Sequence, residues 1–186
     1  MRPGFADLVF GAQECFSALM NAMARPGRMQ LCAMLDDLPH GLAPAAAAAV
    51  LTLADAETPF WTDAEGGARE WLGFHTGAVF APLPAQAQFL LATRGMPTLA
   101  GLNQGSDETP QESATLILQV SGLDDAAGWR LTGPGIQQEH RLLATGLPED
   151  FLAQWAANRA QFPRGVDLVL CAGTQLVALP RGTEIG

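Results

Sequence analysis

The sequence contains no lysine and no tyrosine, and all ten of its strongly basic side chains are arginine. A phosphate-binding P-loop needs a lysine directly after its glycine-rich turn, so the missing lysine excludes this class of nucleotide site. The segment Gly133-Pro134-Gly135 lacks the third glycine of a dinucleotide-binding fingerprint. We interpret it as a loop that ends a strand.

Positive charge is scarce overall, since the net charge is −9 at pH 7. Nucleic acids and anionic membrane surfaces both require a basic footprint, so we expect neither as a partner. The longest apolar run, residues 43–54, is interrupted by Pro44 and Thr52 and falls short of the ~20 residues of a membrane span. The N-terminal residues lead to no apolar stretch of signal-peptide length, so we expect a cytoplasmic protein.

Cysteine is also rare. Cys15, Cys32 and Cys171 form no CxxC pair, and each lies among apolar neighbours. This pattern predicts three buried thiols in a reducing compartment. It also excludes an iron–sulfur centre held by this chain, which would need a cluster of cysteines.

Two apolar segments near the C-terminus predict a β-hairpin. Residues 166–171 are apolar at almost every position, which is typical of a strand covered on both faces. Gly173 suits the tight turn, and residues 176–179 form the return strand, which Pro180 ends because proline has no N–H for the ladder. Another strong strand is predicted at residues 114–120.

Helical patterns alternate with these strands. The spacing of Phe16, Leu19, Met20 and Met23 predicts a helix over 12–23 with one apolar stripe. An alanine run after Pro44 predicts a second helix over 42–55, and a third is predicted over 148–161. The alternation predicts an α/β fold, a three-layer αβα sandwich with a mixed sheet, in one domain spanning residues 1–186.

The remaining segments give weaker patterns. We predict short strands, short helical segments and loops between the elements above. The strands are 29–35, 58–62, 86–92, 129–132 (paired with 114–120) and 139–143; the helical segments are 68–73 and 98–103; the loops are 74–78 and 104–112. Arg25-Pro26-Gly27-Arg28 is predicted to form a type II turn with a positive φ at Gly27.

No catalytic, cofactor-binding or metal-binding residue is predicted. The three histidines, His40, His75 and His140, lack metal-ligand spacing, and no nucleophile-elbow motif is present. Asp55 and Glu57 could form a general acid–base pair. We interpret them instead as residues that end a helix, because side chains two apart on a helix do not share a face.

Arginines near turns and strand ends are the best candidate contacts. A guanidinium there can hold a phosphate through two hydrogen bonds, but it can equally form an ion pair within the chain or contact a partner protein. The candidate ligand or partner contacts are Arg25, Arg28, His75, Arg94, Arg130, Arg164 and Arg181.

Several segments together resemble the PhnH family, the H subunit of the bacterial carbon–phosphorus lyase system. They occur in a consistent order from the first helix to the C-terminus. The matching segments are 18–27, 51–61, 74–78, 113–120, 131–136 and 162–181.

The resemblance implies a fold similar to the large domain of pyridoxal-phosphate transferases and a cytoplasmic role in phosphonate breakdown. In that system the G, H, I and J subunits form a core complex. Together with the L subunit, G, H and I join a phosphonate to the ribose of a nucleoside triphosphate with loss of the base. Cleavage of the carbon–phosphorus bond is ascribed to the iron–sulfur J subunit.

The missing lysine limits what the resemblance implies, because an internal aldimine requires a lysine amine. We therefore expect no pyridoxal phosphate and no other cofactor, and a fold shared without the shared chemistry. Our leading hypothesis is a scaffolding subunit that binds the G, I and J subunits. The alternative is a domain that binds a phosphorylated or phosphonate ligand through the arginines named above.

A homodimer is also predicted for the isolated chain. Three features could supply its contacts: a hairpin at an edge of the sheet, the segment 74–78, and the alanine-rich helix over 42–55, whose small side chains allow close approach.

Overall fold

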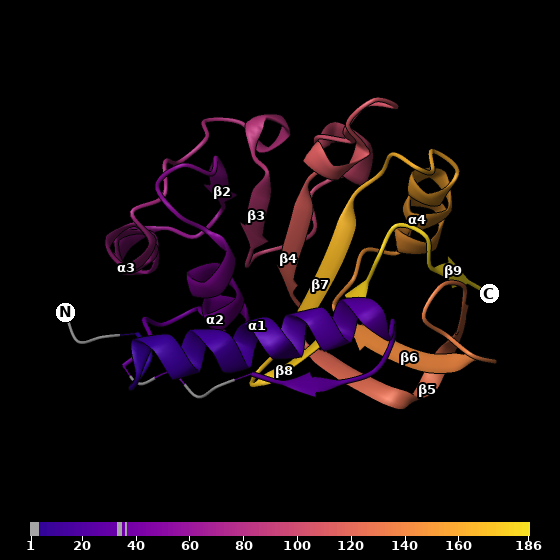
Figure 1. The fold of residues 1–186 in the computed structure, drawn as a ribbon, viewed down its shortest axis with the longest axis horizontal. Coiled ribbons are helices and arrows are strands. Elements are labelled where there is room, and N and C mark those ends of the chain that lie inside the picture. The colour runs from indigo at the N-terminus through magenta and orange to yellow at the C-terminus, as the bar shows by residue number, and fades with distance from the viewer. Residues whose placement is uncertain (1–3, 33–34, 36) are drawn as a thin grey trace.

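The computed structural model describes residues 4–32, 35 and 37–186 and has a six-stranded mixed sheet at its centre (Figure 1). The strand order is β1-β8-β7-β4-β3-β2. Strands β2, β3, β4 and β7 are parallel to one another, β8 is antiparallel to β7, and β1 is antiparallel to β8. The bounds are β1 Gln30–Leu31, β2 Phe60–Thr62, β3 Phe89–Ala92, β4 Thr115–Gln119, β7 Asp167–Ala172 and β8 Gln175–Leu179.

The predicted C-terminal hairpin is confirmed. β7 is buried along almost its whole length, as its continuous apolar sequence requires. Val169 pairs with Ala178 in the register of the hairpin, and Gly173 in the turn has a φ of 56°. The predicted strand at 114–120 is β4, which lies next to β7.

One face of the sheet is covered by three helices: α1 (Leu8–Ala24), α2 (Pro44–Leu53) and α3 (Gly66–Thr76) (Figure 1). Asp7 begins α1 by accepting hydrogen bonds from the backbone N–H groups of Val9 and Phe10. The alanines of α2 are fully buried, so their small side chains serve packing within the chain. The prediction that this helix offers an open face to a partner is wrong.

The opposite face is covered by α4 (Phe151–Arg159) and a three-stranded sheet of order β6-β5-β9. The strands are β5 Gly122–Thr132, β6 His140–Thr145 and β9 Glu184–Ile185. Leu131, Leu142 and Trp155 fill the space between this layer and the central sheet. Three short 3-10 turns, Pro84–Gln86, Leu99–Gly101 and Pro110–Glu112, complete the chain. The α/β class and the mixed sheet are therefore confirmed.

Two predicted segments are wrong in ways that have a physical cause. The strand predicted at 129–132 begins at Gly122 and pairs with β6 and β9 rather than with β4. The strand begins with acidic residues, and its register shifts between Asp124 and Trp129. For both reasons the sequence does not show the alternation of apolar and polar residues that is typical of a strand. The loop predicted at 74–78 is largely the last turn of α3, which ends at Gly77 with a φ of 66°.

The region around residue 30 differs from the prediction too. Only Gln30 and Leu31 of the predicted strand 29–35 form β1, and residues 33, 34 and 36 lie outside the described residues. β1 covers β8, so the hairpin is not an edge of the sheet. Next to it the type II turn is confirmed: Gly27 has a φ of 81°, and the N–H of Arg28 donates to the carbonyl of Arg25 at 3.1 Å. Within the described residues, no helix has the length and apolarity to cross a lipid bilayer.

Candidate functional site

Polar side chains gather where the parallel strands β2, β3 and β4 end, the usual place for sites in open α/β sheets. Asp63 follows β2. Its carboxylate accepts hydrogen bonds from the backbone N–H and the hydroxyl of Thr93, at 2.7 and 2.9 Å, and from the N–H of Arg94 at 3.0 Å. Asp63 thereby fixes the segment that leaves β3.

Gln119, at the end of β4, likewise fixes a neighbouring segment through side-chain hydrogen bonds to its backbone. Its side-chain oxygen accepts from the N–H of Ala43 at 2.7 Å, and its amide nitrogen donates to the carbonyl of Gly41 at 2.9 Å. Gly41 has a φ of 92°, a conformation that favours glycine. These bonds hold the segment before α2, and with it His40, beside the strand ends.

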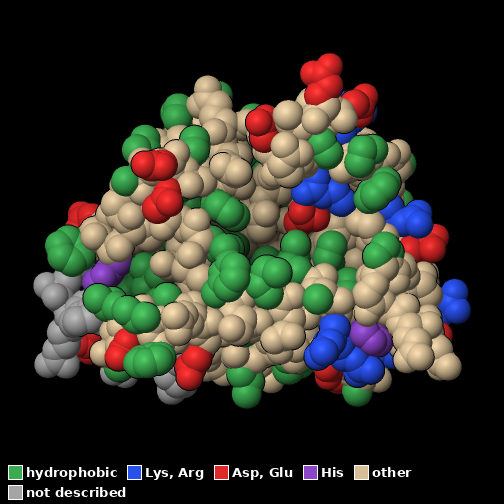
Figure 2. Space-filling view, viewed as in Figure 1, with side chains coloured by type: hydrophobic (Ala, Val, Ile, Leu, Met, Phe, Trp, Pro, Cys, Tyr) green, Lys and Arg blue, Asp and Glu red, His purple; other side chains and the backbone are tan. Residues whose placement is uncertain are grey.

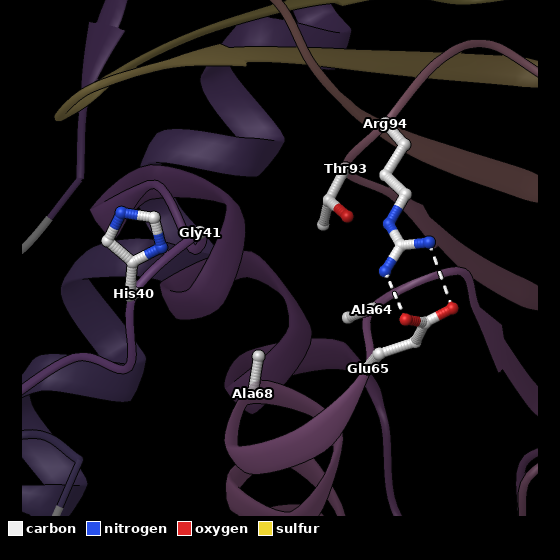
Figure 3. A pocket seen from close by; sticks show the side chains of 7 residues that line it. All are labelled: His40, Gly41, Ala64, Glu65, Ala68, Thr93 and Arg94. Atoms are coloured by element: carbon white, nitrogen blue, oxygen red, sulfur yellow. Dashed lines mark hydrogen bonds and ion pairs between the residues drawn. The ribbon is translucent and has the colours of Figure 1, made fainter.

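The segments enclose a cavity of about 260 Å³ (Figure 3). Arg94 and Glu65 face each other on one side through two contacts, at 2.9 and 2.6 Å, and the His40 ring lies on the other. Hydrogen bonding and charge attraction from Arg94 lower the pKa of the Glu65 carboxyl. The full lining is His40, Gly41, Ala64, Glu65, Ala68, Thr93 and Arg94.

The charges in this cavity cancel. Because Glu65 already pairs with Arg94, the guanidinium offers little net attraction to an anion. The hydroxyl of Thr93 is committed to Asp63. No group of three or more metal-ligating side chains occurs in the part of the chain that the structure describes. This arrangement suits a small polar ligand better than a multiply charged one.

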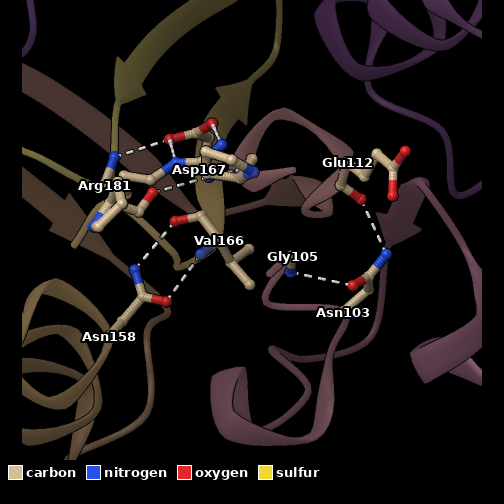
Figure 4. A network of polar contacts seen from close by, with 9 residues as sticks. Asn103, Gly105, Glu112, Asn158, Val166, Asp167 and Arg181 are labelled. Atoms are coloured by element: carbon tan, nitrogen blue, oxygen red, sulfur yellow. Dashed lines mark hydrogen bonds and ion pairs between the residues drawn. The ribbon is translucent and has the colours of Figure 1, made fainter. Parts of the chain in front are cut away.

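Arg181 lies at the opposite, amino ends of the strands, in a buried polar network (Figure 4). Its guanidinium binds Asp167, the first residue of β7, through Nε at 3.1 Å and a terminal nitrogen at 2.5 Å. The other terminal nitrogen donates to the carbonyl of Pro110 at 2.6 Å. Asn158 exchanges two further hydrogen bonds with the backbone of Val166. Arg181 thus joins its own segment to β7 and to the turn at Pro110.

The other arginines are scattered. Arg164 pairs with Asp107 at 3.2 Å and Arg130 with Glu139 at 3.7 Å. Arg25 and Arg28 flank the type II turn, are exposed, and have no ion-pair partner among the described residues. Figure 2 shows basic side chains beside a histidine at the lower right of the molecule. Of the predicted arginines, only Arg94 lines the cavity.

His75 lines neither the cavity nor the Arg181 network. It lies in the last turn of α3, half-buried, with its ring 4.4 Å from that of Trp71 and edge-on to that of Phe74. Burial lowers the pKa of His75. Its Nε2 has no hydrogen-bond partner within the described residues.

Asp55 has a local structural role. Its carboxylate accepts from the backbone N–H groups of Glu57 and Thr58 and from the Thr58 hydroxyl. The Thr58 hydroxyl is the main cause of the lowered pKa of Asp55. Asp55 thus stabilises the turn that follows α2, which ends at Leu53.

The exposed side of α1 is apolar. The stripe predicted for this helix is only partly buried: Leu19 faces the core, whereas Phe16 and Met20 are 51% and 55% exposed. Leu8, Val9 and Phe10 are exposed at its start. Figure 2 shows apolar side chains along the front of the molecule where α1 lies in Figure 1. We call this surface, made of Val9, Phe16 and Met20, the α1 face.

Sequence reasoning missed several residues that build the cavity. Asp63, Glu65 and Gln119 were not singled out, although a polar residue at or directly after the end of an apolar strand was a usable signal at positions 63 and 119. Glu65 gave no such signal, because its pairing with Arg94 joins segments 29 residues apart.

Comparison with known proteins gives a consistent result. A family model described as "Bacterial phosphonate metabolism protein (PhnH)" matches residues 3–186. The chain is 38% identical over 187 residues to the Rhizobium meliloti (strain 1021) protein named "Alpha-D-ribose 1-methylphosphonate 5-triphosphate synthase subunit PhnH", covering 97% of this chain and 93% of that protein. It is 33% identical over 177 residues to the Stutzerimonas stutzeri "Putative C-P lyase subunit protein HtxG", covering 93% and 85%. The chain belongs to the PhnH family.

Proposed function

We propose that this chain is a subunit of a carbon–phosphorus lyase core complex and supports formation of ribose 1-methylphosphonate 5-triphosphate from a nucleoside triphosphate and a phosphonate. The observation that carries the proposal is the match to the PhnH family over residues 3–186, together with a relative named as a subunit of the corresponding synthase. The role proposed is scaffolding, with partners of the G, I and J type.

The distribution of polar groups supports a scaffolding role. Arg94 and Arg181, which lie nearest the two ends of the parallel strands, are both paired with carboxylates. The α1 face offers exposed apolar area of the kind that protein interfaces bury. We therefore place partner contacts on α1 rather than in the cavity.

Co-purification tests the proposal. The tagged chain is co-expressed with the G, I and J subunits, and we expect all four in one complex. Phe16→Glu with Met20→Glu should reduce recovery of the partners at least tenfold, because it places charge in a buried contact. Leu152→Glu is the matched control, since Leu152 is 45% exposed on α4 in the opposite layer. Failure of the wild-type chain to co-purify would contradict the proposal itself.

Arg25 and Arg28 favour a second candidate function, binding of a phosphorylated or phosphonate ligand. They are the predicted arginines without an ion-pair partner among the described residues. However, they also lie at the C-terminal end of α1, where cations favourably meet the helix dipole without any ligand. Titration with methylphosphonate decides between these roles: the ligand-binding function requires saturable binding that Arg25→Ala with Arg28→Ala abolishes and Arg130→Ala retains.

The isolated chain is proposed to be a cytoplasmic homodimer. Two of the dimer surfaces predicted from the sequence are not available to a second chain, because β1 covers the hairpin and the α2 alanines are buried. Of the three predicted surfaces, the helix end at Phe74 remains exposed. Sedimentation at micromolar concentration should give a species of twice the 19.6 kDa chain mass, with more than ~1,000 Å² buried in total. A monomer throughout that range would contradict self-association and leave the complex untouched.

We also propose that the family's resemblance to pyridoxal-phosphate transferases is one of fold alone. Without lysine, the chain has no side-chain amine for an internal aldimine. Incubation with pyridoxal phosphate and borohydride should therefore leave no internal residue modified. A modified peptide away from the N-terminal amine would overturn this prediction.

A further inference from the structure

Two of the three cysteines meet inside the protein. Cys15 lies on the buried side of α1, and Cys32 directly follows β1. Their sulfur atoms are 2.8 Å apart, although the residues are 17 positions apart in the chain. The backbone N–H of Cys32 donates to the carbonyl of Thr174 in the β7–β8 turn at 3.0 Å, which fixes the position of this cysteine.

We propose that Cys15 and Cys32 form a dithiol that hydrogen peroxide oxidises to an intramolecular disulfide. A disulfide bond is about 2.05 Å long, so the two sulfur atoms have only a short distance to close. Both side chains are buried, at 0% and 6% exposure. The oxidant must therefore be a small neutral molecule, because a bulky disulfide reagent cannot reach either sulfur.

The environment of Cys15 favours reaction there. A hydrogen bond with Cys32, and a weaker one with Thr52, lower the pKa of the Cys15 thiol despite its burial. The thiolate is the nucleophile in thiol oxidation, so the lowered pKa favours attack by Cys15. Cys171 lies within β7, where burial raises the pKa of its thiol far above the usual range. We therefore assign no reaction to Cys171.

The reaction balances with hydrogen peroxide as the two-electron oxidant. The sulfur of Cys15 attacks one peroxide oxygen and the O–O bond breaks. This gives a sulfenic acid at Cys15, and the departing hydroxide takes the thiol proton to form water. The sulfur of Cys32 then attacks the sulfur of Cys15, and the sulfenic hydroxyl leaves with the Cys32 proton as a second water. Two thiols and one peroxide thus give one disulfide and two waters.

The cross-link would tie the first helix to the strand at the edge of the sheet. It closes a loop that contains the end of α1, the Arg25–Arg28 turn and β1. The Arg25–Arg28 turn, whose arginines have no ion-pair partner among the described residues, would then be covalently linked at both ends. A dithiol reductant reverses the bond.

Thiol counting on the folded wild-type chain tests the proposal. The protein is treated with hydrogen peroxide, unfolded, alkylated with iodoacetamide and mapped by mass spectrometry. We expect alkylatable cysteines to fall from three to one, with Cys15 and Cys32 in one linked peptide. Dithiothreitol should restore all three.

Matched variants identify the pair. Cys171→Ser should still form the link, whereas Cys15→Ala and Cys32→Ala should lose it. A link that involves Cys171, a link between two chains, or three alkylatable thiols after peroxide treatment would each overturn the proposal. The wild-type measurement requires no variant to fold.

Discussion

The two ends of the parallel strands use the same ion pair in different surroundings. At the amino ends, the side chains of Arg181 and Asp167 are only 15% and 12% exposed. At the carboxyl ends, those of Arg94 and Glu65 are 58% and 73% exposed and border a cavity. A buried pair is costly to break, whereas an exposed pair is screened by water. The ion pair at the amino ends therefore stabilises the fold, whereas the residues at the carboxyl ends can be substituted with little loss of stability.

The largest expected effect comes from breaking the buried pair. Asp167→Asn leaves the Arg181 guanidinium buried without its counter-charge, so the free energy of unfolding should fall by about 3–5 kcal/mol. Urea denaturation followed by fluorescence measures this change. Glu65→Gln is the matched control at the other end and should leave the midpoint within experimental error. Equal losses in the two variants would remove the distinction between the ends.

Two glycines allow a finer comparison. Gly165, at the amino ends, has a φ of 120°, and a Cβ there would lie 3.0 Å from the Asn158 carbonyl oxygen. Gly41, at the cavity, has a φ of 92° with nothing within 4 Å. Gly165→Ala should cost about 2–3 kcal/mol from backbone strain and crowding together, and Gly41→Ala about 1 kcal/mol from strain alone. The same denaturation measurement compares them, and a larger loss for Gly41→Ala would contradict this account.

The smallest effect concerns the titration of Glu65. Because Arg94 lowers its folded pKa, the stabilising contribution is fully present above the ordinary pKa of a glutamate and is lost as the pH falls through the lowered value. Arg94→Gln should return the Glu65 pKa to its ordinary range, as followed by carbon NMR of the side-chain carboxyls. Asp55 is the control, because its lowered pKa arises from Thr58 and Glu57. A Glu65 pKa that does not change would show that Arg94 is not the cause.

Much of the fold could be predicted from the sequence because it follows local patterns. The continuous apolar run of β7 and the alanines of α2 each identify their element directly. β5 was largely missed because its first half consists mainly of acidic and small residues, and Gly128 lies where its register shifts. α3 was predicted too short, since Gly73 resembles a stop signal whereas Gly77 ends the helix.

The candidate site could be predicted only in part, because charge pairing depends on tertiary structure. Arg94 was identified from its place after a strand, and it does line the cavity. Nothing in the local sequence reveals that Arg181 binds the carbonyl of Pro110, 71 residues away. Asp167, within an apolar run, gave no sign that it serves as the partner of a buried arginine.

The shortness of the outer strands bears on how this chain behaves at high concentration. β1 has two residues and β2 has three, and the outer side of β2 is bonded to Val79 and Ala81. Long bare strands act as templates on which further chains add, which leads to aggregates. At the two edges of the central sheet, an incoming strand therefore finds hardly any backbone to pair with. The chain can therefore keep exposed apolar side chains on α1 for specific assembly while the edges of its central sheet give little opportunity for uncontrolled fibre growth.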